Sequence, residues 1–176
     1  MQTPPDTGPL LAGPPVGESD PRALLLGYLD WYREALFRKL DGLTEEQLRT
    51  PVEGLGWPVL ALVKHLGWVE RRWLRWGFLA EDVLGRPPGG TPAEWRIEPD
   101  EPTADVVAAY RAQVERSRAI TAAAGLDEPS AVGGRFPTPE AAPPMGRILF
   151  HLLQEYARHL GQLDAARQLL DGVTGP

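Results

Sequence analysis

Two ionisable side chains interrupt the apolar face of the segment at residues 148–170, which reads ILFHLLQEYARHLGQLDAARQLL. At about 100° per residue, the segment forms one apolar helical stripe. The stripe comprises Ile148, Leu152, Leu163 and Ala166. Glu155 and His159 lie in the same stripe, and side chains four residues apart on a helix have Cβ atoms about 5–6 Å apart. A buried carboxylate needs a cation, several hydrogen bonds or a metal, so the pair is a candidate for binding one metal ion from a single helix.

A third candidate, His65, lies in a second predicted helix at residues 57–80, whose start is marked by Pro58. His65 points into an apolar face of this helix. That face includes Leu62, Val69 and Trp76. A lone histidine on such a face is more often hydrogen-bonded in the core than bound to metal, and both interpretations remain open. Arg72 shares the inward direction, and we expect it either to pair with Glu155 or to meet an anionic ligand.

Helix periodicity predicts two further long helices, one at residues 23–40 and one that follows Thr103 and reaches about residue 124. The capping signals before them are Ser19 or Asp20 followed by Pro21 for the first, and Thr103 for the second. Thr44 and Gln47 have the spacing of a capping box, which predicts a short helical turn after the first long helix.

Two stretches rich in proline and glycine, residues 85–102 and 127–144, are too broken for regular structure and are expected to be long crossovers. Trp95 should pack the first crossover against the rest of the chain. Four long helices with one short and two long connections favour an all-α, antiparallel four-helix bundle. Metal sites in such bundles form from inward side chains of facing helices, so His65 could complete a site with the glutamate–histidine pair.

The composition is that of a globular protein, with 43% hydrophobic and 24% charged residues in a chain of 176. This length favours a single domain, which we place at residues 19–176. Residues 1–18 are rich in proline and glycine and are expected to form a flexible arm. No stretch has the length and apolarity of a membrane span or the pattern of a signal peptide, so we expect a cytoplasmic protein that does not enter a membrane.

Charge and cysteine content restrict the chemistry. A formal net charge of −6 argues against nucleic-acid binding, which calls for clustered lysine and arginine. The chain has no cysteine, which excludes disulfides, thiolate metal ligands and a protein thiol as nucleophile. Any sulfur chemistry would therefore need an external thiol.

Two motifs, VKHLGWVERRW at residues 63–73 and HLLQEYARHLGQLDAARQLLDG at residues 151–172, resemble the DinB/YfiT-like superfamily, and most closely its branch of mini-circle proteins. The resemblance covers residues 21–172. It implies a four-helix bundle, often dimeric, in which three side chains hold a divalent metal. On this sequence the implied ligands are His65, Glu155 and His159.

Two nearby positions qualify this implied ligand set. Relatives often have a histidine where this chain has Gln162, which could instead reach the metal through a water or orient His159. His151, one turn before Glu155, is the substitute ligand if the glutamate does not bind the metal. Two nitrogens and one oxygen do not distinguish zinc, nickel, iron and manganese.

The resemblance also implies a reaction, in which the metal activates a low-molecular-weight thiol of the mycothiol or bacillithiol type for transfer to a small electrophile, as in detoxification. One alternative keeps the metal but activates water, giving a hydrolase. The other is a non-catalytic helical module, whose histidines and glutamate form a buried polar network. Four tryptophans line either an aromatic substrate pocket or, more in keeping with their type, the core or a dimer interface. They are Trp57, Trp68, Trp73 and Trp76.

Overall fold

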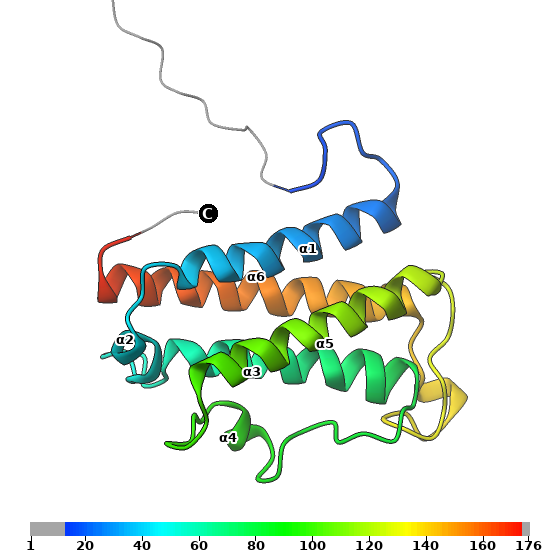
Figure 1. Ribbon diagram of the computed structural model, residues 1–176. Helices are drawn as coiled ribbons and strands as arrows, with labels where there is room; N and C mark the ends of the chain where they lie inside the picture. The colour runs from blue at the N-terminus through cyan, green and yellow to red at the C-terminus, as the bar shows by residue number, and fades with distance from the viewer. Residues whose placement is uncertain (1–12, 174–176) are drawn as a thin grey trace, which may run out of the picture.

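The computed structural model describes residues 13–173 and consists of four long helices packed along their lengths (Figure 1). They are α1 (Pro21–Leu40), α3 (Val59–Glu70), which a π-helix η1 (Arg71–Phe78) continues, α5 (Thr103–Ala123) and α6 (Met145–Leu170). The shorter elements are α2 (Glu45–Arg49), α4 (Thr91–Glu94) and a 3-10 helix η2 (Pro139–Ala141). The described residues form no β-strand, which confirms the predicted all-α bundle.

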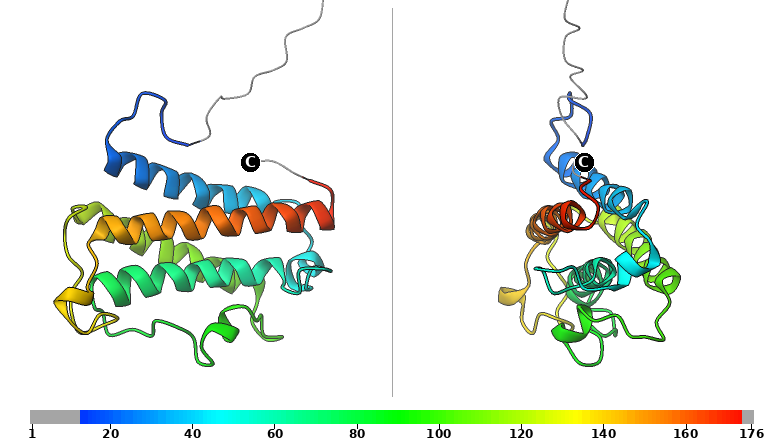
Figure 2. Two further views of the ribbon diagram at one scale, coloured as in Figure 1. Left: turned by 180° about the vertical axis from the view of Figure 1, so that it is seen from behind. Right: turned by 90° about the vertical axis from the view of Figure 1, so that its left-hand side faces the viewer.

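The helices form two parallel pairs that run in opposite directions. α1 and α6 run one way, and α3 and α5 run the other way (Figures 1 and 2). α1 packs beside α6, α3 beside α5, and α3 also packs against α6. Because α3 and α5 are parallel, the chain must return along the whole bundle between them, and residues 79–102 make this return. The predicted long crossover is thus a consequence of the topology.

Side-chain caps mark the starts of the first two helices. The Asp20 carboxylate accepts a hydrogen bond from the Ala23 amide at 2.7 Å and caps α1, and the predicted Thr44 capping box is present at α2. The prediction that Thr103 caps α5 is wrong. Thr103 is already helical, and its hydroxyl donates to the Glu45 carboxylate at 2.6 Å instead.

The core confirms the apolar stripe predicted for α6. Ile148, Leu152, Leu163 and Ala166 have no exposed surface. Of the predicted N-terminal arm, residues 1–12 lie outside the described part of the chain, and residues 13–18 precede α1 without regular structure. None of the described helices combines the length and apolarity that crossing a membrane requires.

A buried polar layer links the four long helices at one level of the bundle. Arg33 of α1 donates to the Glu70 carboxylate of α3 at 2.8 Å. Tyr156 of α6 also donates to Glu70, and its hydroxyl is 2.7 Å from that of Tyr110 on α5. Burial by itself lowers the pKa of Arg33, but the Glu70 charge outweighs burial and raises this pKa, so the guanidinium stays charged. The layer is therefore an ion pair inside the core.

We predict that Arg33→Met lowers the free energy of unfolding by about 3–5 kcal/mol, because it leaves the Glu70 carboxylate buried without a cation. Arg33→Met/Glu70→Met should lose less than the single variant, since it removes both charges together. Urea denaturation of the wild type, of Arg33→Met, of Glu70→Met and of the double variant measures these differences. A double variant that loses the sum of the two single losses would show that the charges are not coupled.

Candidate metal centre

The three predicted ligands meet between α3 and α6, which face each other along the bundle (Figure 2). One ligand atom from each of His65, Glu155 and His159 lies within 4.8 Å of the others. Glu155 Oε2 is 3.2 Å from His159 Nε2 and 3.9 Å from His65 Nε2. Both histidines are buried, whereas 24% of the Glu155 side chain is exposed. The group is thus open to solvent on the glutamate side.

The outer nitrogen of each imidazole faces a hydrogen-bond acceptor. His159 Nδ1 is 2.7 Å from Gln162 Oε1, and His65 Nδ1 is 2.9 Å from the Glu94 carboxylate. A ring that carries protons on both nitrogens donates to Glu155 as well, whereas a neutral imidazole with its proton on Nδ1 donates only to that acceptor and directs its Nε2 lone pair toward Glu155. Three acceptors converge on one point, and such imidazole–acceptor pairs are typical of metal-binding histidines. The donor set thus fits a divalent cation.

The electrostatics keep the glutamate ionised. Hydrogen bonds from His159 and His65 hold the pKa of Glu155 far below its usual range. Burial lowers the pKa of His65, but hydrogen bonds to Glu155 and Glu94 outweigh burial and raise this pKa. The carboxylate therefore favours a positive charge at the centre of the group, which a metal ion or a proton on His65 can provide.

Glu94 was missed by the sequence analysis. It lies on α4, inside a crossover predicted to lack regular structure, and it is fully buried. Besides the His65 proton, it accepts hydrogen bonds from Arg72 at 2.5 Å and from Arg86 at 3.3 Å. Burial raises the pKa of Glu94, but the bonds from His65 and Arg72 outweigh burial and lower it. Of the two alternatives for Arg72, the pairing with Glu155 does not occur, because Arg72 pairs with Glu94 instead.

Trp95 follows Glu94 and packs the crossover against the site, as expected. Its ring stacks on the His65 ring with centroids 4.4 Å apart, and its centroid is 5.5 Å from that of His159. The indole also contacts Trp57 edge to face. Trp95 thus forms an apolar wall over the two imidazoles.

His151 stands beside the group and does not complete it. Its Nε2 is 3.3 Å from Glu155 Oε1, the oxygen that faces away from the other two histidines. Its ring packs on Trp73 with centroids 4.2 Å apart. Burial lowers the pKa of His151 and outweighs the opposite effect of Glu155. The alternative ligand set with His151 in place of Glu155 is therefore less compact than the set that contains Glu155.

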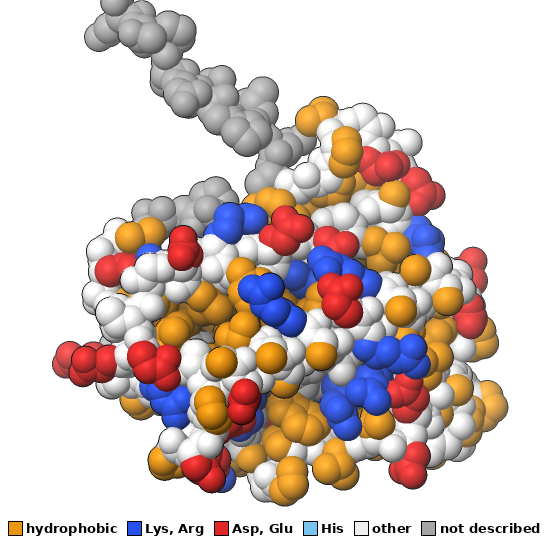
Figure 3. Space-filling view, in the orientation of Figure 1, with side chains coloured by type: hydrophobic (Ala, Val, Ile, Leu, Met, Phe, Trp, Pro, Cys, Tyr) orange, Lys and Arg blue, Asp and Glu red, His pale blue; other side chains and the backbone are white. Residues whose placement is uncertain are grey.

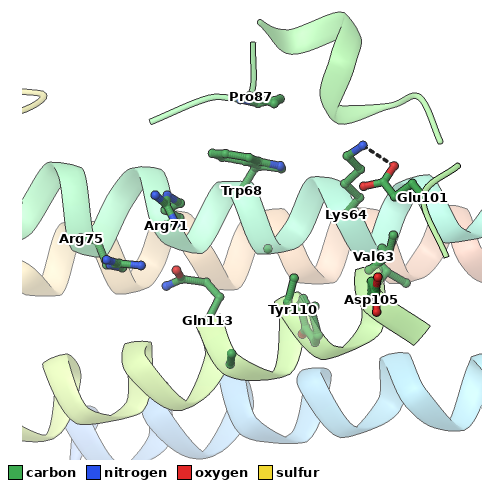
Figure 4. A pocket seen from close by; sticks show the side chains of 14 residues that line it. Val63, Lys64, Trp68, Arg71, Arg75, Pro87, Glu101, Asp105, Tyr110 and Gln113 are labelled. Carbon is green, nitrogen blue, oxygen red and sulfur yellow. Dashed lines mark hydrogen bonds and ion pairs between the residues drawn. The ribbon is translucent and has the colours of Figure 1, made fainter. Parts of the chain in front are cut away.

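The four predicted tryptophans do not share one pocket. Trp68 lines a cavity of about 620 Å³ between α3, η1 and α5, together with Lys64, Arg71 and Gln113 (Figure 4). Lys64 is paired there with Glu101 at 2.7 Å. Trp57 and Trp73 pack against the core instead. Because none of the three candidate ligands lines this cavity, it is distinct from the candidate metal centre.

The comparisons with known proteins agree with this geometry. A family model described as Mycothiol-S-transferase matches residues 24–172. The match includes all of the described helices in full except α1, whose first three residues precede it. A search of curated proteins found no match.

We predict that His65→Ala and His159→Ala each abolish binding of one divalent ion per chain. His151→Ala removes the neighbouring imidazole of α6 that is not a candidate ligand, and this variant should retain the ion. The measurement is metal content and titration calorimetry of protein purified without a histidine tag. Unchanged metal content in the first two variants would show that the ligands are elsewhere.

The hydrogen bonds to Nδ1 give a second prediction. Glu94→Gln should weaken metal binding about tenfold, because it removes the negative charge that makes His65 a stronger ligand. Gln162→Glu is the matched change at the other imidazole and should strengthen binding by a similar factor. Calorimetric titration measures both, with thermal unfolding as a control for the loss of the Arg72 partner. Equal affinities in all three proteins would exclude a role for these bonds.

Proposed function

Because the chain belongs to the mycothiol-S-transferase family, we propose that it is a metal-dependent S-transferase that joins a low-molecular-weight thiol to a small electrophile. Mycothiol, or a related thiol such as bacillithiol, is the proposed cosubstrate. The observation that supports this most directly is the convergence of His65, Glu155 and His159 on one point. Three protein ligands would leave a coordination position open for a substrate.

The chemistry needs a sulfur nucleophile that the chain does not contain, since it has no cysteine. A divalent cation held by the three side chains would lower the pKa of a bound thiol, so that a thiolate is available near neutral pH. In the transfer, the thiol proton goes to solvent and the sulfur electron pair forms a bond to an electrophilic carbon. The leaving group departs from that carbon with its bonding electrons.

The residues around the centre have separate proposed roles. Glu94 and Gln162 hold the imidazoles with Nε2 toward Glu155, and the Glu155 charge offsets part of the charge of a cation. Trp95 keeps water from the apolar side of the rings. Nitrogen and carboxylate ligands suit zinc, nickel, iron or manganese alike. Each of these residues binds or orients another group. The nucleophile itself is the thiol of the cosubstrate.

We predict that metal-loaded protein accelerates conjugation of mycothiol, bacillithiol or glutathione to a haloalkyl electrophile, because a larger fraction of the thiol is ionised. The rate should fall to background in His159→Ala. It should remain unchanged in a control variant altered at a distant surface position, such as Arg116→Gln. Mass spectrometry of the products measures the conjugate.

Two outcomes would contradict this proposal. A product that carries oxygen from labelled water and forms without thiol would indicate a hydrolase. Full stability with neither metal binding nor conjugation would indicate a helical module, in which His65, Glu155 and His159 form a buried polar network.

A further inference from the structure

Three arginines lie near one another beside the candidate metal centre. The Glu94 carboxylate pairs with only two of them. Arg72 and Arg86 both contact Glu94. The third, Arg135, forms neither a hydrogen bond nor an ion pair through its side chain with any of residues 13–173. The cluster is therefore left with an excess of positive charge.

Arg135 reaches the site from residues 124–144, the second long connection. Its amide donates to the Trp76 carbonyl at 3.1 Å, which ties the connection to η1. Its guanidinium carbon lies 4.1 Å from the centroid of the Trp73 ring. Trp73 in turn contacts His151, whose Nε2 is 3.3 Å from Glu155. These contacts connect Arg135 to the glutamate side of the site through Trp73 and His151.

The environment of Arg135 is unfavourable for an unpaired cation. The side chain is half-buried, and burial lowers its pKa, as do the charges of Arg72 and Arg86. A cation on the face of an aromatic ring is stabilised by only about 0.5–2 kcal/mol. A guanidinium in this position has N–H donors left for an anion.

Several other arginines of the chain pair with nearby carboxylates. Arg116 pairs with Glu81, which also holds Arg75, and Arg118 pairs with Asp30. On the surface that includes α5, basic side chains lie partly in groups, with acidic side chains beside them (Figure 3). Arginines such as Arg38, Arg111 and Arg147 also lack a carboxylate partner, but they are exposed, whereas Arg135 is half-buried and its side chain has neither a hydrogen bond nor an ion pair with the described residues.

We propose that Arg135, held over Trp73 and supported by Arg86, binds a carboxylate group of one of the two substrates. The inference rests on the proposed function, because it takes the candidate metal centre as the place where the substrates meet. The planar guanidinium can donate two parallel N–H bonds to a carboxylate. Arg72 and Arg86 repel Arg135 and attract the same anion. The site thus selects a carboxylated substrate over a neutral one.

The competing interpretation is that Arg135 only clamps the connection onto η1 through its contact with Trp73. A clamp would affect stability and would not discriminate between a charged and a neutral ligand. Arg135→Gln and Arg135→Lys separate these roles, since Lys keeps the charge but loses the planar pair of donors.

The test is calorimetric titration of succinate, a dicarboxylate without a thiol, into the wild-type protein at fixed ionic strength. We expect binding that weakens at least about tenfold in Arg135→Gln, as for loss of one charge-assisted pair, and less in Arg135→Lys. Arg116→Gln removes the same charge elsewhere and should bind as wild type does. Succinamide, the neutral analogue, should not bind.

Equal binding of succinate to wild type and Arg135→Gln, or no binding to wild type, would overturn the proposal. The titration does not depend on turnover, so succinate binding without any conjugation would reject the S-transferase function and leave the carboxylate site intact. Conjugation that is unaffected by Arg135→Gln for both charged and neutral substrates would reject the carboxylate site and leave the S-transferase function intact.

Kinetics then identify which substrate carries the carboxylate. A carboxylated thiol with a neutral electrophile, and a neutral thiol with a carboxylated electrophile, are compared in wild type and Arg135→Gln. We expect KM to rise at least about tenfold for the carboxylated partner in one of the two pairs, with kcat little changed. A fall in kcat with unchanged KM for both pairs would contradict a binding role.

Discussion

The bond between Tyr156 and Glu70 fixes the relation between the two helices that form the candidate centre. Glu70 lies five residues after His65 on α3, and Tyr156 directly follows Glu155 on α6. A shift of either helix along its axis would break this bond inside the core, where an unpaired carboxylate is strongly unfavourable. Because the layer also includes Arg33 and Tyr110, it sets the register of all four long helices. The placement of Glu155 opposite His65 depends on this register.

Periodicity was enough to predict the long helices and the residues that meet between them. Glu155 and His159 could be predicted because residues four apart on a helix point the same way, and here that way is the apolar face. His65 could be predicted because it also lies on the apolar face of its helix. Glu94 could not be found in this way, since a helix of four residues has no period to detect. Its only signals were the proline of Gly-Thr-Pro and the neighbouring Trp95. The homodimer and the cytoplasmic location stay predictions.

The π-helix was not predicted, but it is the unforeseen Glu94 that explains why Arg72 does not pair with Glu155. The prediction took 100° per residue through the whole helix, which placed Arg72 on the side of Glu155. From Arg71 to Phe78 the backbone instead follows the wider π-helix, in which hydrogen bonds span five residues. Side chains in this segment therefore turn through a smaller angle per residue. Arg72 is only the second residue of this segment, so it keeps the direction of His65, and both side chains meet Glu94 on the crossover. Trp73, the next residue, meets His151 on α6.

The site divides its parts between rigid helices and long connections. α3 and α6 carry the three candidate ligands, whereas Glu94, Trp95 and Arg135 come from the two connections that pass over them. Connections of this kind tolerate insertion and replacement better than the elements they join. Exchange of either connection between homologous proteins would consequently give new selectivity while the scaffold beneath it remained the same. For an engineer, the two connections are the natural positions for a combinatorial library.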